Sequence, residues 1–454
     1  MAGAPPICDS STSIRQASKL MADHRAVLVR TASGFGIVTD SDLRRRVLSE
    51  GISPDRPIAQ VMTFPVHVVD RETLVDDVVL DMLELGVHHL PVVEGDAVIG
   101  MVSDLEVFGN KRRSPLDLRS RVDSAESSAE LADIGRGFPH AAIDLWKAGV
   151  DAEHVGLWLG TLTDRLTARL LDICVDHLGP APVGWAWLAL GSLGRCEQAL
   201  TADQDHALIY DDGGQGHDEY FAELARKVVT GLAASGFPEC ESRVMATEPA
   251  WRMSIGDWLY RLDQWMAEPD RLYGFFSGIV FDYRRIAGTL EIVPELDRMA
   301  RKAAKDFHFV KRLAELAIAH PSPLLPLGRL RTTNAGGGRR TLDIKETGLF
   351  PITEMARALA LGSGVAVPST LQRLRWAGND TEWSEASASL IQVFKTMQQV
   401  RLQHQVRQLH AGWPADDLIV PGQLDRLTLL QLRDAFRVLR AVMGDLAYRL
   451  DLMK

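Results

Sequence analysis

The residues best suited to chemistry stand on either side of a Gly-Ser turn. A short apolar run at 185–190 predicts a strand, and Gly191 and Ser192 after it predict a tight turn that leads into a short helix. A second strand is predicted around Asp203 and Asp205, which are two residues apart. Side chains two apart on a strand point to the same face, so both carboxylates would project into one site.

The predicted chemistry of this site is nucleotidyl transfer. Two convergent carboxylates suit a hard divalent cation such as Mg²⁺ or Mn²⁺. The turn at Gly191 and Ser192 would offer backbone N–H groups to phosphate oxygens. A metal site beside a phosphate cradle is what transfer of a nucleotide needs. The alternative is a glycine-rich turn next to a solvated acidic strand end, a known risk with short motifs.

The whole motif is more specific than its parts. Gly-Ser-x-Gly-Arg-x-Glu runs from Gly191 to Glu197, and Asp-Gln-Asp follows at 203–205. The pattern resembles the polymerase-β nucleotidyltransferase superfamily and, within it, the PII-protein uridylyltransferases. It is most similar to the CBS-domain-containing nucleotidyltransferase family, because the glycines, Arg195, Glu197 and both aspartates fall in register.

The resemblance implies further site residues. A predicted short strand at 280–288 is similar to the Asp-x-Arg segment of the uridylyltransferases, which implies that Asp282 is the third metal carboxylate and helps to deprotonate the acceptor. Arg195 and Arg284 are candidates for contacts with phosphate or acceptor, because the guanidinium fork matches phosphate geometry. The alternative for Asp282 is a salt bridge with a neighbouring arginine.

Composition narrows the protein class. The 454 residues carry a formal net charge of −10, which argues against a nucleic-acid scaffold. The four cysteines are scattered and include no CxxC pair, as is typical of a reducing cytoplasm. The sequence shows neither a signal peptide nor an apolar run of bilayer length, so a cytoplasmic protein without a membrane partner is expected.

The first hundred residues contain an internal repeat. The segment at 36–43 is echoed at 100–107, and each copy is preceded by a predicted strand, at 26–30 and 89–93. The repeat resembles a tandem pair of CBS domains. The resemblance implies that such a pair binds AMP, ADP or ATP, with Thr39 and Asp42 in one half-site.

The second CBS half-site departs from the usual pattern. Its corresponding positions are Ser103 and Glu106, and Glu106 replaces the aspartate that would contact ribose hydroxyls. Adenylate binding is therefore expected to be stronger at the first half-site. The alternative is a pair that only packs, spaces the domains or forms a homodimer, since a fold resemblance alone does not establish a ligand.

The predicted fold class is α+β multidomain. We expect a tandem CBS α/β pair at 1–113, a helical linker region at 114–180 and a polymerase-β-type nucleotidyltransferase core at 181–300. That core would be a small mixed sheet flanked by helices. The remaining segment, 301–454, is expected to form a mainly helical C-terminal domain.

The predicted function is Mg²⁺-dependent transfer of NMP from an NTP to an acceptor, regulated by adenine nucleotides at the CBS pair. By analogy with PII uridylylation, the expected acceptor is a protein. Arginines of the C-terminal region could contact an acidic or phosphate-bearing partner; they include Arg329, Arg331, Arg373 and Arg401. One alternative is a non-catalytic adenylate sensor that uses the transferase fold as a docking platform. Another is a small-molecule nucleotidyltransferase.

Overall fold

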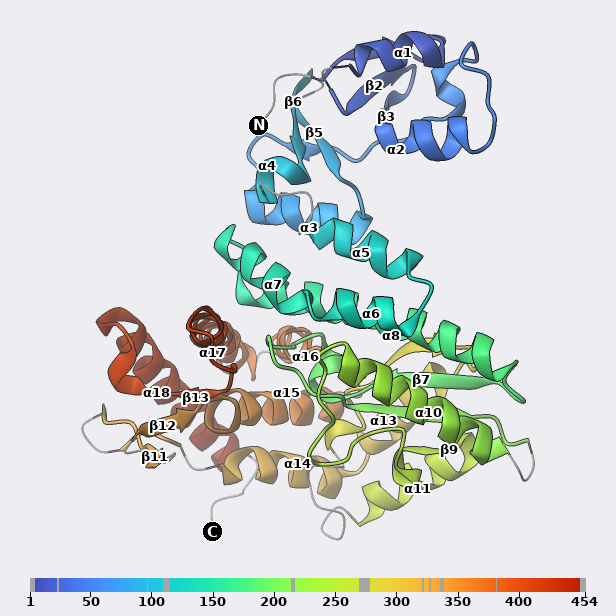
Figure 1. The fold of residues 1–454 in the computed structure, drawn as a ribbon. Coiled ribbons are helices and arrows are strands. Elements are labelled where there is room, and N and C mark those ends of the chain that lie inside the picture. The colour runs from blue at the N-terminus through green and yellow to red at the C-terminus, as the bar shows by residue number, and fades with distance from the viewer. Residues whose placement is uncertain are drawn as a thin grey trace. The chain divides into compact units, whose positions relative to one another are not determined.

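The computed structural model describes residues 5–22, 24–95, 97–108, 115–213, 217–268, 278–320, 322–325, 328–334, 339–380 and 382–449. Two compact units are present. The first comprises Met1–Ser120 with Lys147–Val150, and the second comprises Arg121–Trp146 with Asp151–Lys454. Figure 1 shows the elements of both units along the chain.

The first unit consists of two similar halves. Each has a three-stranded sheet, ordered β1-β2-β3 in one and β4-β5-β6 in the other. In both sheets the first pair of strands is parallel and the second pair is an antiparallel hairpin, which confirms the repeat predicted from the sequence. The elements of the first half are β1 (Ile7–Asp9), α1 (Ile14–Leu20), β2 (Ala26–Thr31), β3 (Gly34–Thr39), α2 (Asp40–Asp42), η1 (Leu43–Leu48) and η2 (Ile58–Gln60). Those of the second are β4 (Val69–Asp70), α3 (Val75–Leu85), β5 (His89–Glu94), β6 (Ala97–Ser103) and α4 (Asp104–Phe108).

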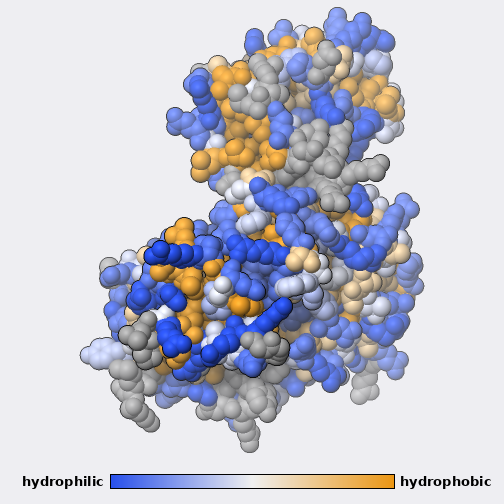
Figure 2. Space-filling model, turned by 60° about the vertical axis from the view of Figure 1, so that its left-hand side comes forward, coloured by the Kyte–Doolittle hydropathy of each residue, from blue (hydrophilic) through white to orange (hydrophobic). Residues whose placement is uncertain are grey.

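Apolar side chains join the two halves. Leu28 and Ile37 of the first half pack with Met101 of the second in one buried cluster. Other hydrophobic side chains of this unit remain at the surface, among them Leu48 and Leu74, which are 76% and 68% exposed. Figure 2 shows orange hydrophobic patches on the visible face of this unit.

The second unit contains a four-stranded sheet ordered β10-β7-β8-β9. β7 runs antiparallel to β10 and β8, whereas β8 and β9 are parallel, so this is the small mixed sheet that the sequence predicted. The strands are β7 (Trp185–Ala189), β8 (His206–Tyr210), β9 (Arg252–Ser254) and β10 (Arg284–Gly288).

Helices surround this sheet. α8 begins at an Asp151 side chain that accepts a hydrogen bond from the His154 N–H, and it packs against α10 (Figure 1). α5 (Pro115–Ser124) crosses the boundary between the two units. The other helices of this part are α6 (Ser128–Gly135), α7 (Phe138–Lys147), α8 (Ala152–Leu178), α9 (Gly191–Arg195), α10 (His217–Ala234), η4 (Pro249–Trp251), α11 (Ile255–Ala267) and α13 (Val293–Ala303).

The C-terminal part of the unit is mainly helical, as predicted. Its helices, orange to red in Figure 1, are α14 (Phe307–Ala319), η6 (Lys345–Leu349), α15 (Phe350–Gly362), α16 (Thr370–Ala377), α17 (Ser384–His410), η7 (Pro421–Gln423) and α18 (Arg426–Arg449). A small sheet accompanies them, made of β11 (Thr333–Asn334), β12 (Arg340–Asp343) and β13 (Leu418–Ile419).

One hydrophobic core runs through the sheet and the C-terminal helices. Leu188 and Ile209 of the sheet belong to the same buried cluster as Ile352 of α15, Phe394 of α17 and Leu446 of α18. Burial of such side chains is the main source of folding free energy. The sheet and the C-terminal helices therefore stabilise each other. None of the described helices has the length and apolar character that crossing a membrane requires.

Candidate functional site

The Gly-Ser turn packs so closely against two acidic residues that two of its positions leave no room for a side chain. At Gly191, where α9 (Gly191–Arg195) begins, φ is +56°, and a Cβ atom would lie 2.7 Å from the Asp205 carboxylate. At Gly194, a Cβ atom would collide with the backbone carbonyl of Asp282. Glycine is therefore required at both positions for steric reasons. The two glycines of the motif therefore allow the turn to pack directly against Asp205 and Asp282.

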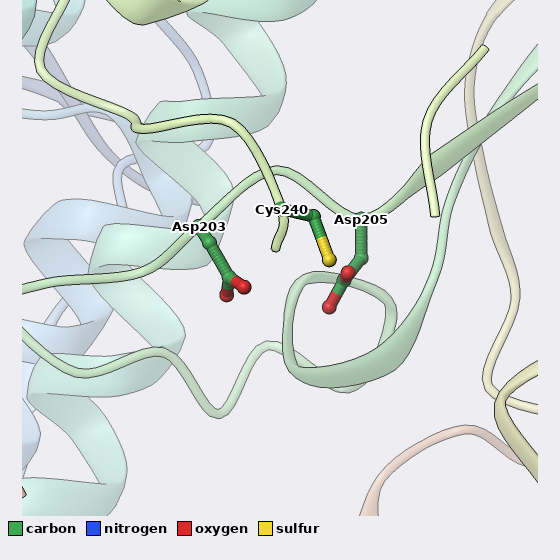
Figure 3. A group of neighbouring side chains, drawn as sticks. All are labelled: Asp203, Asp205 and Cys240. Carbon is green, nitrogen blue, oxygen red and sulfur yellow. The ribbon is translucent and has the colours of Figure 1, made fainter. Parts of the chain in front are cut away.

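The structure brings Asp203 and Asp205 together with Cys240. Both aspartates lie in the segment just before β8, and Gln204 between them forms an isolated parallel bridge with Glu239. This bridge places Cys240 beside the pair. Ligand atoms of the three side chains all lie within 4.8 Å of one another (Figure 3). The strand predicted around the two aspartates begins only at His206, so neither lies on a strand, but their carboxylates converge as the spacing predicted.

Burial determines the electrostatics of this cluster. Burial first, and then the neighbouring Asp203 carboxylate, raise the pKa of Asp205 to about 7. Burial and the Asp205 carboxylate raise the pKa of the Cys240 thiol to about 12, so this thiol stays protonated near neutral pH. Two carboxylates beside a neutral thiol form a donor set that fits a hard divalent cation.

Asp282 lies in a buried cluster of arginines. Its Oδ1 accepts hydrogen bonds from Arg357 Nε at 3.1 Å and Arg373 Nη1 at 2.5 Å, and its Oδ2 accepts from Arg195 Nη1 and Arg357 Nη2, each at 2.5 Å. Burial alone would raise the pKa of Asp282. The three guanidinium groups more than offset this and hold that pKa well below its usual range.

This arrangement differs from the predicted role of Asp282 as a third metal ligand. The acidic group that the described residues form around Asp203 and Asp205 does not include Asp282, and both of its oxygens are occupied by arginines. The alternative from the sequence, a salt bridge, describes the observed contacts. Because its pKa is low and it is fully buried, Asp282 is also unsuited to take a proton from an acceptor.

The two predicted phosphate contacts are engaged within the protein. Arg195 Nε donates to Glu197 at 2.8 Å, in addition to its bond with Asp282. Arg284 Nη2 donates to the Leu193 carbonyl at 2.8 Å and to Asp164 at 3.0 Å. Both arginines therefore hold the Gly-Ser turn in place.

A cavity of about 330 Å³ opens over the aspartate pair. Among the predicted site residues, Gly191, Ser192, Arg195, Asp203 and Asp205 line it, whereas Asp282 and Arg284 do not. The C-terminal part supplies another portion of the wall, including Lys345, Thr353, Arg357, Gln398 and Arg401. Chemistry at the pair would thus take place in a space that both parts of the unit enclose.

Several residues of this site escaped the sequence analysis. Cys240 lay in no recognisable motif. Arg357 stands three residues after Glu354 in a helix that is otherwise largely apolar, and this buried charge pair was a readable signal. Arg373 was expected at a docking surface, but it is 1% exposed and bound to Asp282. Arg401 forms a bidentate pair with Asp417, at 2.6 and 2.7 Å.

The predicted CBS ligand residues contact each other in both halves of the first unit. The Thr39 N–H donates to Asp42 Oδ2 at 2.9 Å and the Asp42 N–H donates to Thr39 Oγ1 at 3.4 Å, which forms a capping box for α2. Thr39 Oγ1 also donates to Asp42 Oδ2, at 2.7 Å. The Ser103 N–H and Oγ donate to Glu106 Oε2 at 3.1 and 3.3 Å. The Glu106 carboxylate thus accepts from the backbone and the hydroxyl of Ser103, as Asp42 does from Thr39, despite its longer side chain.

Comparisons with known families agree with this architecture. The family model "Putative nucleotidyltransferase DUF294" matches residues 136–271, and the model "Putative nucleotidyltransferase substrate binding domain" matches residues 307–450. The CBS domain model matches residues 1–49 and 58–110. The chain therefore matches a CBS-containing nucleotidyltransferase family, and the predicted α+β multidomain fold is confirmed.

Individual relatives cover only part of the chain. The protein is 30% identical over 170 residues to "CBS domain-containing protein CBSCBSPB3" of Arabidopsis thaliana. The aligned region is 36% of this chain and 28% of that protein. It is 35% identical over 163 residues to "CBS domain-containing protein CBSCBSPB1" of the same plant, with 35% and 28% covered. The chain thus spans less than a third of the length of these relatives.

A solved structure also resembles part of the chain. It is a "putative signal-transduction protein with CBS domains from Burkholderia ambifaria MC40-6", 28% identical, with 24% of this chain and 85% of that chain covered and a TM-score of 0.22.

We predict that the charge of Asp205 lowers stability at alkaline pH. The unfolded carboxyl ionises near pH 4, but the folded one ionises near pH 7, so the metal-free protein loses stability as pH rises between these values. Asp205→Asn removes this cost. Its free energy of unfolding at pH 8 should exceed that of the wild type by about 1–4 kcal/mol, with little difference near pH 4. Urea unfolding in EDTA measures both values.

The matched control is Asp211→Asn, at the other end of β8, which should show no comparable gain at pH 8. An Asp205→Asn protein that is less stable than the wild type at pH 8 would contradict a raised pKa at this position.

Proposed function

We propose that this protein is a nucleotidyltransferase that transfers NMP from an NTP to an acceptor, with Mg²⁺ or Mn²⁺ as cofactor. One observation carries the proposal. Asp203 and Asp205 converge on a cavity of about 330 Å³, and the segment matched by the substrate-binding model supplies part of the wall of that cavity. The match of residues 136–271 to a nucleotidyltransferase model supports the same reaction class.

The residues around the pair have distinct roles in this proposal. Asp203 and Asp205 would hold the divalent cation, which would neutralise phosphate charge during an in-line displacement. The backbone at Gly191 and Ser192 would lie under the phosphates. Arg195 and Arg284, as positioning residues, would keep that backbone in place through Glu197, Asp282 and the Leu193 carbonyl.

The transfer step itself is a displacement at the α-phosphorus. The acceptor oxygen forms a bond to that phosphorus, and the bond to the oxygen bridging the β-phosphate breaks, so pyrophosphate leaves with the electron pair. The proton of the acceptor hydroxyl passes to solvent, because Asp203 and Asp205 would be engaged with the cation.

The acceptor in this proposal is a protein, by analogy with the uridylyltransferases, and the reaction would take place in the cytoplasm.

The competing function is a non-catalytic adenylate sensor. One observation favours that alternative: Asp282 is bound by three arginines, so the described pair lacks the third carboxylate that the resemblance implied.

We predict that Asp203→Asn and Asp205→Asn each reduce transfer by at least about 100-fold and leave the fold intact. Each change removes a negative charge that the metal site needs. Incubation with each labelled NTP, Mg²⁺ or Mn²⁺ and cell lysate, followed by gel separation, measures transfer to a protein band. Circular dichroism measures the fold.

The matched control is the Asp211→Asn, Asp212→Asn double variant, which removes two aspartates from the opposite end of β8 and should label normally. Unchanged labelling by the Asp203→Asn, Asp205→Asn double variant would end the catalytic interpretation.

The first unit would regulate this reaction by binding an adenine nucleotide. Thr39 and Asp42 would form the stronger half-site, Ser103 and Glu106 the weaker one. The exposed hydrophobic side chains of this unit, such as Leu48 and Leu74, support a homodimer formed through it.

We predict that Asp42→Asn weakens AMP binding to the full-length protein about 10-fold, and more than Glu106→Gln does. The reason is that a hydrogen bond between a carboxylate and ribose hydroxyls is lost. Calorimetry measures AMP directly, and ADP and ATP are measured in the Asp203→Asn, Asp205→Asn background. Glu94→Gln, which alters an exposed ion pair of the same unit, is the control. If the wild type shows no heat with any of these nucleotides, the unit has a structural role.

A further inference from the structure

Four cationic side chains line the cavity over the aspartate pair, and three of them are paired with carboxylates of the protein. Arg195 is bonded to Glu197 and Asp282, and Arg357 is bonded to Asp282 and paired with Glu354. Arg401 forms a bidentate pair with Asp417. Their charges are therefore largely neutralised by the protein itself.

Lys345 is the remaining cation. It is exposed to the cavity, and among the described residues no carboxylate oxygen lies within 4.0 Å of its ammonium nitrogen. A structural salt bridge, which is the ordinary role of a lysine near acidic side chains, is thus not formed in the part of the chain that the structure describes.

The backbone around Lys345 is held firmly. Lys345 is the first residue of η6, directly after β12 and Ile344. The Ile344 N–H donates to the Asp417 carbonyl at 3.0 Å, and the Glu346 N–H donates to Asp343 Oδ1 at 2.9 Å. The flexible side chain of Lys345 is therefore attached to a backbone that hydrogen bonds hold in the cavity wall.

Lys345 and the aspartate pair line the same cavity. The ammonium is attracted to the carboxylates of Asp205, Asp343 and Asp417, but none of the three lies within 4.0 Å of its nitrogen. Lys345 belongs to the C-terminal part of the unit and Asp205 to the segment before β8, so the cavity brings a cation of one part near a carboxylate of the other.

We propose that Lys345 binds the β- and γ-phosphates of the NTP and stabilises the pyrophosphate that leaves. This inference rests on the proposed function. When the acceptor oxygen bonds to the α-phosphorus, the electron pair of the broken P–O bond stays on pyrophosphate, where negative charge develops. A lysine ammonium is a compact charge on a flexible stem and suits a leaving group that changes position.

A consequence is that the catalytic site is composite. The segment before β8 supplies the two carboxylates, and the C-terminal part supplies the cation for the leaving group. The assignment fits the charge of the site, because a triphosphate placed beside two carboxylates needs more positive charge than a divalent cation alone provides.

The test compares Lys345→Met and Lys345→Arg with the wild type and with Lys305→Met, an exposed lysine outside this cavity. Calorimetry with Mn²⁺ and an α,β-methylene NTP, which cannot release pyrophosphate, measures triphosphate binding. The matching NMP measures binding without the β- and γ-phosphates. Lys345→Met should weaken binding of the NTP analogue about 10-fold or more and leave NMP binding unchanged. Lys345→Arg should restore part of the loss.

Each other result has a definite meaning. Equal binding of the NTP analogue by Lys345→Met and the wild type would overturn the inference while leaving the proposed function intact, even if transfer to the acceptor fell. Equal weakening of the NTP analogue and of NMP would also overturn it. If the wild type itself bound no NTP analogue, both this inference and the proposed function would fail.

Discussion

The buried carboxylate of Asp282 is the interaction on which the rest of the site depends. It binds three guanidinium groups that come from separate parts of the sequence: Arg195 after the Gly-Ser turn, Arg357 in α15 and Arg373 in α16. Removing one partner of a buried ion pair typically costs about 3–5 kcal/mol, because the other charge is left uncompensated. Here three cations would lose their common partner.

The Asp282 cluster explains why sheet and C-terminal helices enclose one cavity. Glu197 reinforces it by accepting hydrogen bonds from the N–H and Oγ1 of Thr370, the first residue of α16. A continuous hydrophobic core lies beneath these polar contacts. The aspartate pair and Lys345 therefore line one cavity whose two sides are held together.

Local sequence patterns predicted the elements well. The strand before the Gly-Ser turn and the internal repeat follow from periodicity and turn chemistry. The strand after the turn begins at His206, later than predicted, yet the carboxylates of Asp203 and Asp205 converge as their spacing indicated. The contacts of Asp282 could not be predicted in this way. Its partners Arg357 and Arg373 lie 75 and 91 residues away, and only tertiary packing brings them together. Lys345 joins the site for the same reason.

The central claim is that Asp203 and Asp205 hold a divalent cation beside a bound nucleotide. Anomalous diffraction from crystals grown with Mn²⁺ and an α,β-methylene NTP tests it most directly. We expect an anomalous peak between the two carboxylates and in contact with the phosphates of the analogue. A bound analogue with no anomalous peak at this pair, or with its peak at other side chains, would contradict the claim.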